Sequence, residues 1–355
     1  MNFLLLGFML LDCGEEERGL NFGVDFNMIN NRLYGNIDVY FNRTKDLLYS
    51  ISIPDITGFT NIQTNVGEMS NNGIEASISY KILDQKDFHW TATANVWANR
   101  NKIITITGQD ADHDGKEDDL VSSGLFIGKS RFAIYDYQPN GFYQVGETPI
   151  PGFVTGTEKL VDQNKDNDIT PAKDRVFLGR REPAYQLSLY NQFSWKALTV
   201  SVFFNSIQGG NDGFLGANSP FYFRDDNAIR NNYPVQTDFW SPRNPSGKYP
   251  RNISGTHAKI EPGAPSFSPD VHQLWQKRNF IRLQDVSVSY NLTSLIKSVK
   301  FQQLSVFVSG KNLKTWTNWD GWDPEALDNN GFPMGLVTNG RPVMKAFSVG
   351  VHITY

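Results

Sequence analysis

Two acidic stretches place oxygen-bearing side chains at the spacing that a hard cation requires. In the first, acidic or amide side chains occupy positions one, three, five and seven: Asp162, Asn164, Asp166 and Asp168. Such ligands can converge on one Ca²⁺, as in EF-hand loops. Asn167 stands at position six, where glycine is usual, and Asn tolerates the left-handed backbone. Lys173 replaces the bidentate Glu at position twelve, so we expect a weak calcium loop, and a solvated acidic turn is the alternative.

A second stretch keeps the glycine but lacks the last ligand. Asp110, Asp112 and Asp114 occupy positions one, three and five, Gly115 is at six, and Val121 is at twelve. An ordinary surface turn is the favoured interpretation, with calcium binding as the alternative. A structural Ca²⁺ in either stretch would stiffen a loop without taking part in chemistry, and no other cofactor is expected.

Aromatic side chains in or beside further predicted loops could stack on sugar rings. They are Trp240, Tyr249, Trp316, Trp319 and Trp322. The favoured alternative is the aromatic girdle found where membrane strands meet the interface. Trp90, Trp195 and Tyr355 lie near the other ends of predicted strands and are assigned to a girdle outright.

No group of residues has the composition of a catalytic centre. Asp323 and Glu325 stand two apart, but no base or nucleophile accompanies them, so we interpret them as a solvated turn around Pro324. The single Cys and five His show no zinc-binding spacing. The sequence therefore predicts a protein that is not an enzyme.

Composition excludes two further classes. The formal net charge of −4 argues against a nucleic-acid binder, and no apolar run approaches the roughly 20 residues of a membrane-spanning helix. Membrane strands remain compatible because their hydropathy signal is weaker. The 13% aromatic content, with 30 Gly and 17 Pro, favours strands and loops.

Period-two alternation of apolar and polar residues marks about nine long strands. The clearest has apolar residues at Leu20, Phe22, Val24, Phe26 and Met28. The pattern recurs in 33–41, 74–82, 90–98, 185–195, 198–204, 286–292, 304–308 and 347–355. These lengths are near or above the roughly 10 residues that a tilted membrane strand needs.

The connections between these strands alternate between short and long. Short ones span 29–32, 84–87, 196–197 and 293–300, and long ones span 50–67, 107–183, 209–277 and 314–343. Outer-membrane barrels have short periplasmic turns and long extracellular loops, so the four long connections are predicted to be extracellular. The second face of the strands carries Asn, Ser, Thr and Gln rather than Lys and Glu, which also favours a barrel over a soluble β protein.

The rule that short turns are periplasmic also gives the direction of each strand across the membrane. The last strand, and by counting back the first, runs from outside to inside. Residues 1–17 contain an apolar run like that of a signal peptide, but no Lys or Arg precedes it, so we expect a strand remnant or a sequence read from a displaced start. An odd strand count with an external N-terminus predicts that 18–355 is the C-terminal part of a larger barrel.

Ten short passages along the chain are similar to one known family of proteins. The most specific is Gly321-Trp322-Asp323-Pro324-Glu325, before the last strand. The others are 34–40, 45–48, 65–75, 126–129, 134–137, 238–245, 249–251, 280–286 and 309–313. In this order they cover nearly all of 18–355, and together they resemble the C-terminal portion of SusC/RagA-type TonB-linked outer-membrane transporters of Bacteroidota.

The resemblance implies an all-β, antiparallel transmembrane β-barrel of the 22-stranded TonB-dependent receptor type, of which this chain supplies the C-terminal part, about nine strands. It also implies a plug, energy supplied through TonB, and a SusD-like surface lipoprotein that captures glycan or peptide. The plug and the TonB-contacting segment are expected to lie outside this sequence. The alternative is a soluble β-rich binding or adhesion module with calcium-stiffened loops.

Overall fold

The computed structural model describes residues 14–52, 61–150, 153–213, 238–248, 251, 275–293, 302–319, 323–325 and 343–354. Among these residues, no helix is long and apolar enough to cross a membrane. Within the described ranges, the regular structure consists of strands and one short 3₁₀ turn, Val121–Ser123. The predicted remnant segment lies almost wholly outside the described residues, as does Tyr355.

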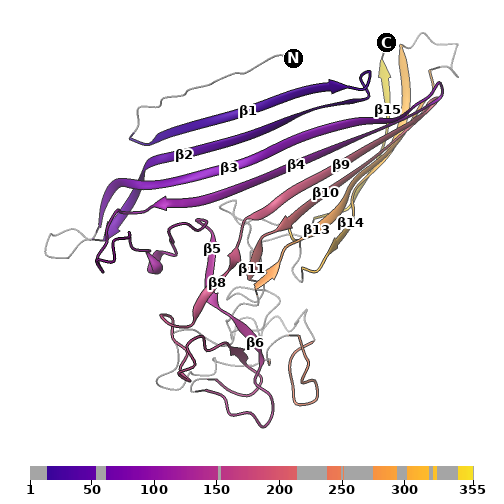
Figure 1. Cartoon of the computed structure of the whole chain (residues 1–355). Coiled ribbons are helices and arrows are strands. Elements are labelled where there is room, and N and C mark those ends of the chain that lie inside the picture. The colour runs from indigo at the N-terminus through magenta and orange to yellow at the C-terminus, as the bar shows by residue number, and fades with distance from the viewer. Residues whose placement is uncertain are drawn as a thin grey trace.

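A nine-stranded antiparallel sheet forms the body of the molecule (Figure 1). The spatial order is β1-β2-β3-β4-β9-β10-β13-β14-β15, so each strand lies beside the next long strand in sequence. Their bounds are β1 Glu16–Met28, β2 Leu33–Ser52, β3 Asn61–Asp84, β4 Phe88–Thr105, β9 Pro183–Trp195, β10 Leu198–Gly209, β13 Phe280–Asn291, β14 Gln303–Thr317 and β15 Ala346–Thr354. The prediction of about nine antiparallel strands is confirmed.

Tight turns join alternate pairs of strands at one end of the sheet. Between β1 and β2, Ile29, Asn30 and Asn31 all adopt positive φ angles, and the Arg32 N–H donates to the Ile29 carbonyl at 3.1 Å. The β9–β10 turn places Lys196 at φ 52°. These turns set the register, in which Met28 pairs with Leu33 and Trp195 with Leu198.

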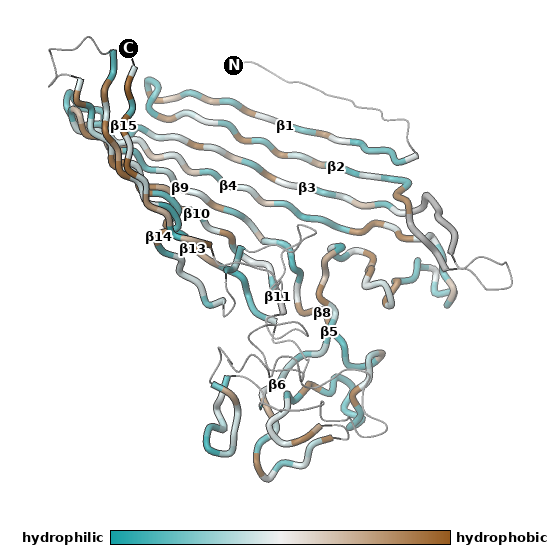
Figure 2. The backbone as a smooth tube through the Cα atoms, turned by 180° about the vertical axis from the view of Figure 1, so that it is seen from behind, coloured by the Kyte–Doolittle hydropathy of each residue, from teal (hydrophilic) through white to brown (hydrophobic). Residues whose placement is uncertain are grey.

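The two faces of the sheet differ in chemistry. One face exposes large apolar side chains, among them Phe22 at 48%, Val24 at 60%, Phe347 at 74% and Val349 at 81%. On the other, polar side chains form rows across strands; in one, Asn95 pairs with Ser77 and with Ser188. Figure 2 shows hydrophobic and hydrophilic residues alternating along the strands. A sheet with one exposed apolar face and one polar face matches the wall of a membrane barrel.

Two predicted loop boundaries are wrong. β2 continues to Ser52 and β3 begins at Asn61, so the predicted connection 50–67 shrinks to 53–60. β14 and β15 likewise shorten the connection predicted at 314–343 to 318–345. Backbone ladders need no apolar side chains, so strands continue past the point where the apolar alternation ends.

The connection between β4 and β9 is a folded unit rather than an irregular loop. It contains β5 Ala133–Tyr137, β6 Pro139–Phe142, β7 Glu158–Leu160 and β8 Arg175–Arg180, in the pairs β5-β8 and β6-β7. Its core consists of Tyr137, Tyr143, Phe153, Leu160 and Ile169, all 6% exposed or less. Between β10 and β13, β11 Asn211–Gly213 pairs with β12 Trp275–Lys277. These small sheets gather beyond one end of the main sheet (Figure 1).

Candidate functional site

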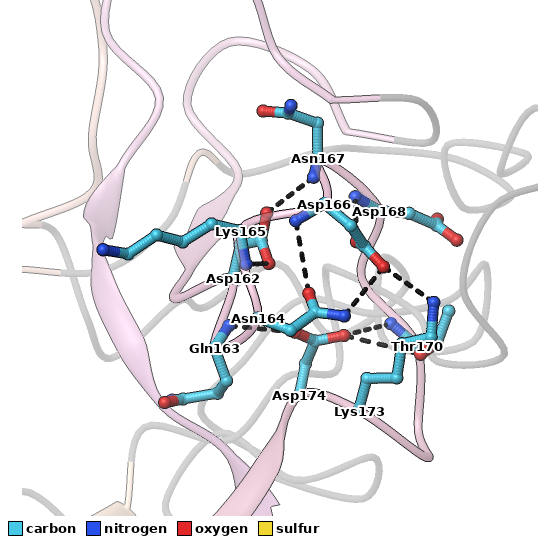
Figure 3. Close-up of polar contacts among 10 residues, drawn as sticks. All are labelled: Asp162, Gln163, Asn164, Lys165, Asp166, Asn167, Asp168, Thr170, Lys173 and Asp174. Carbon is cyan, nitrogen blue, oxygen red and sulfur yellow. Dashed lines mark hydrogen bonds and ion pairs between the residues drawn. The ribbon is translucent and has the colours of Figure 1, made fainter.

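The first acidic stretch forms a tight loop stabilised by its own side chains (Figure 3). The two carboxylate oxygens of Asp162 accept the backbone N–H groups of Lys165 at 2.6 Å and Asn167 at 2.7 Å. Asp166 accepts the Asp168 N–H at 3.0 Å. Asn167 has a φ of 63°, as expected for an Asn in place of the turn glycine. The Asp168 side chain is exposed on the loop.

Lys173 brings a positive charge into this loop. Its ammonium lies 2.7 Å from Asp166 Oδ2, the oxygen that also accepts a hydrogen bond from Asn164 Nδ2 at 2.8 Å. The Lys173 ammonium and the Asn164 amide hold the pKa of Asp166 below its usual value, and Asp166 raises the pKa of Lys173. At position twelve, the ammonium neutralises a carboxylate that a metal ion would otherwise bind.

Asp174 closes the base of the loop and was missed as a site residue. It is fully buried and accepts the N–H groups of Gln163 at 3.0 Å and Thr170 at 2.7 Å. A short acidic run does not reveal which carboxylate points inward. The sequence signal that could have identified Asp174 is the apolar Ile169, one residue before Thr170. Ile169 packs in the core and so places this side of the loop against it.

The second acidic stretch leaves its carboxylates closer to one another. Ligand oxygens of Asp110, Asp112 and Asp118 lie within 4.8 Å of one another. Asp114 is outside this group, and its Oδ1 accepts the Lys116 N–H at 2.8 Å. Asp118 is at position nine, which EF-hand loops often use, although it was not selected as a ligand from the sequence. The structure therefore brings together two of the three predicted ligands with one that was not predicted.

Glu117 fixes this second loop to the end of β4. Its Oε1 accepts the N–H groups of Ile106 and Thr107, each at 2.6 Å, and of Gly108 at 2.8 Å. Burial alone would raise the pKa of Glu117, but hydrogen bonds from Thr105 and these backbone groups outweigh it and lower the pKa. Glu117 is therefore a structural anion.

The aromatic candidates do not form one binding surface. Trp240 is 4% exposed and donates from Nε1 to Gln144 Oε1 at 3.0 Å. Its ring packs directly on Gly156: a Cβ added at this glycine would lie 2.2 Å from the ring. Trp319 is 6% exposed, whereas Trp316 is 48% exposed on the apolar face beside Ile281. Tyr249 and Trp322 lie outside the described residues. Trp240 and Trp319 are packing residues in this structure, and Trp316 has the position of a girdle residue.

The interpretation of Asp323 and Glu325 as a solvated turn is wrong. Arg282, 1% exposed, donates from Nη2 to both oxygens of Asp323 at 2.8 and 2.7 Å. Its Nη1 donates to Glu325 at 2.6 Å, and its Nε donates to Thr315 Oγ1 at 3.0 Å. Asp323 is itself only 8% exposed. We call these three charged residues the Arg282 clamp.

The clamp attaches residues 323–325 to the polar face of β13 and β14. Arg278 strengthens the attachment by donating from Nε to the Pro324 carbonyl at 3.0 Å. The guanidinium of Arg282 also lies 4.9 Å from the centroid of the Phe280 ring. Arg282 and an Asp-Pro-Glu run about forty residues later were both visible in the sequence, but nothing in either showed that they meet.

Comparisons with known proteins agree with this architecture. No family model matches the chain. It is 27% identical over 366 residues to TonB-dependent receptor P3 of Formosa agariphila, covering 96% of this chain and 34% of that protein. It is 27% identical over 337 residues to TonB-dependent receptor SusC of Bacteroides thetaiotaomicron, covering 91% of this chain and 31% of SusC. The chain thus spans about a third of the length of these relatives.

Solved structures show the same fold. The RagAB peptide transporter superimposes with a TM-score of 0.65 at 21% identity, over 96% of this chain and 35% of that chain. The RagAB peptide importer in its "open-open" state gives a TM-score of 0.68 over 96% of this chain and 34% of that chain.

Proposed function

Because this chain is a homologue of the SusC/RagA-type TonB-dependent receptors over nearly all of its length, we propose that it contributes part of the barrel wall to an outer-membrane transporter for nutrient uptake. TonB-dependent receptors of this type reside in the outer membrane, and the all-strand fold agrees with that location. The observation that carries the proposal is the nine-stranded antiparallel sheet, apolar on one face and polar on the other, with its three longest connections, 106–182, 210–279 and 318–345, at one end.

The polar face supports a role in lining the transport path. Amide and hydroxyl side chains link neighbouring strands there: Asn95 Nδ2 donates to Ser188 Oγ at 2.9 Å, and Asn101 Nδ2 donates to Asn71 Oδ1 at 3.0 Å. Neutral hydrogen-bonding groups suit a water-filled lumen, since they hydrate readily without fixing one sign of charge. A path lined in this way is compatible with oligosaccharides or peptides, which are the substrates that we propose.

The partners follow from the same relationship. We propose that the complete transporter receives energy through TonB and pairs at the cell surface with a SusD-like lipoprotein that captures the substrate. The folded unit between β4 and β9 lies at the end of the sheet that carries the long connections, so it is on the side where such a lipoprotein would dock.

Uptake by cells tests the proposal. The codons for residues 14–354 would be removed in frame from the gene in its own genome, and uptake of fluorescent oligosaccharide and peptide mixtures measured with and without complementation. We expect uptake of one of the two classes to be lost and then restored by the complementing copy. Wild-type uptake of both classes after the deletion would refute the proposed transport function.

A further inference from the structure

A basic hollow lies at the junction between β4 and the unit that follows it. It has a volume of about 570 Å³, and its charged lining residues are Arg100, Lys102, Lys129 and Arg180. The remaining lining residues are neutral: Asn101, Gly128, Ser130, Ala133, Phe177 and Gly179. Four cationic side chains therefore share one open hollow that no acidic residue lines.

Two of the four cations, Arg100 and Lys102, project from the apolar face of the sheet. β4 pairs with β3 without interruption from Thr91 to Ile103, so its side chains alternate regularly between the faces over this stretch. Arg100 and Lys102 consequently share a face with the apolar residues Val96 and Ala98. At about 3.3 Å per residue, Arg100 lies roughly 7 Å beyond Ala98 towards the long connections. The cations thus begin where the apolar band ends.

Neighbouring strands carry cations at the same level. The register places Arg18 opposite Arg43, Arg43 opposite Ser70, and Ser70 opposite Lys102. Arg18 is paired with Glu16 at 2.7 Å, and Arg43 is paired with Glu68. At the far end of this row, the charge of Lys102 has no such carboxylate partner within the described part of the chain.

The other cations of the hollow are held by neutral groups. Arg100 Nη1 donates to the backbone carbonyl of Ala184 at 2.9 Å, and Lys129 Nζ lies 4.4 Å from the centroid of the Phe177 ring. Lys102 passes close to Gly128: a Cβ added at this glycine would lie 3.6 Å from Lys102 Cε. None of the four cations forms an ion pair with any carboxylate that the structure describes.

The pKa of Arg180 is lowered by its surroundings in the hollow. Burial lowers its pKa, the nearby charge of Arg100 lowers it further, and Glu182 opposes both effects. Glu182 is itself engaged, since it accepts a hydrogen bond from Ser130 Oγ. An anion in the hollow would stabilise the protonated guanidinium and reduce the repulsion between the cations.

We propose that this hollow binds the phosphate of an outer-leaflet lipid headgroup. A lipid phosphate sits at the edge of the hydrocarbon layer, which is the level that Arg100 and Lys102 occupy at the end of the apolar face. Arginine and lysine together bind phosphate through charge-assisted hydrogen bonds, and basic hollows on membrane proteins are a recurring site for lipid headgroups. The inference rests on the placement of the sheet in the outer membrane and is independent of the substrate carried.

Binding of a defined lipid to the transporter that contains this chain, purified in detergent micelles, tests the proposal. Native mass spectrometry would compare phosphorylated lipid A, the same lipid with its phosphate removed, and inorganic phosphate. We expect the phosphorylated lipid to bind at least about tenfold more tightly than the dephosphorylated one. In Lys102→Gln/Lys129→Gln that preference should disappear, whereas Lys116→Gln/Lys165→Gln, which removes two exposed lysines from the acidic loops, should retain it.

Three results would overturn the proposal: equal binding of the two lipids, an unchanged preference in Lys102→Gln/Lys129→Gln, or inorganic phosphate binding as tightly as the lipid. The last result would identify a general anion site. If the double variant does not fold, as judged by circular dichroism, Lys102→Gln alone provides the test. A loss of at least about threefold is expected from this exposed side chain.

Discussion

At the scale of single residues, Arg282 is a buried charged group held by several partners at once. Its guanidinium is nearly inaccessible to solvent, is shared between Asp323 and Glu325, and is also bonded to Thr315. Removing one member of a buried ion pair leaves the other charge without compensation, which costs more than the net contribution of the pair. The clamp should therefore matter to stability far more than the exposed ion pairs of the strands.

Arg282→Ala is expected to lower the free energy of unfolding by about 3–5 kcal/mol, because Asp323 would remain buried and unpaired. Chemical denaturation of the folded chain in detergent, followed by tryptophan fluorescence, would measure the change. Arg18→Ala is the control, since it removes an arginine whose ion pair with Glu16 is exposed, and no measurable change is expected. Equal effects of the two substitutions would refute the role assigned to the clamp.

The two acidic loops differ at single positions, and this difference is also testable. Asp110, Asp112 and Asp118 can share a cation, whereas Lys173 already neutralises Asp166 in the other loop. We predict one weak calcium site, formed by Asp110, Asp112 and Asp118, with a Kd of about 0.1–1 mM. Isothermal titration calorimetry should show that Asp110→Asn/Asp112→Asn abolishes it.

Lys173→Glu restores a carboxylate at position twelve of the other loop, so this variant should gain a second calcium site. The absence of any calcium-dependent heat in the wild-type chain would contradict the first prediction. An unchanged stoichiometry in Lys173→Glu would contradict the explanation based on Lys173.

At the scale of elements, the strands were predictable because one face of each is apolar. Period-two alternation located Leu20 to Met28 and the other long strands in their observed order. Strand ends were less predictable: β2 and β3 continue past the clear alternation through mixed polar and apolar residues whose backbone still pairs, as Ser52 does with Asn61. The core of the unit between β4 and β9 was also missed, because Tyr137, Phe153 and Ile169 come from short segments without periodicity.

Adjacent residues of β13 give a matched test of the two faces. Val288 is 41% exposed on the apolar face, and Ser287 points to the opposite face. Val288→Arg should destabilise the membrane-inserted state by about 2–4 kcal/mol, with a smaller effect nearer the interface, while Ser287→Arg should be tolerated. The measurement is the denaturant midpoint of each variant in lipid bilayers, and the prediction fails if Ser287→Arg is as damaging as Val288→Arg.

At the scale of the whole molecule, the sequence predicted the architecture better than it predicted the sites. The alternation of short and long connections identified the barrel wall, because the positions of strands and connections can be read directly along the sequence. Trp240 and the Arg282 clamp depend on contacts between residues distant in sequence, such as Trp240 with Gln144 and Arg282 with Asp323. No local pattern encodes those contacts, so a buried packing tryptophan resembled a ligand platform and a buried ion pair resembled a solvated turn.

The central claim is that one face of the nine-stranded sheet contacts lipid and the other faces a water-filled path. Single cysteines would be introduced into a Cys13→Ser background at Val96, Val288, Asn95 and Ser287, and spin-labelled in outer membranes. Accessibility to lipid-soluble oxygen and to a water-soluble nickel chelate would then be compared. We expect labels at the two valine positions to favour oxygen and labels at Asn95 and Ser287 to favour the chelate; equal access of the chelate to all four positions would contradict the account.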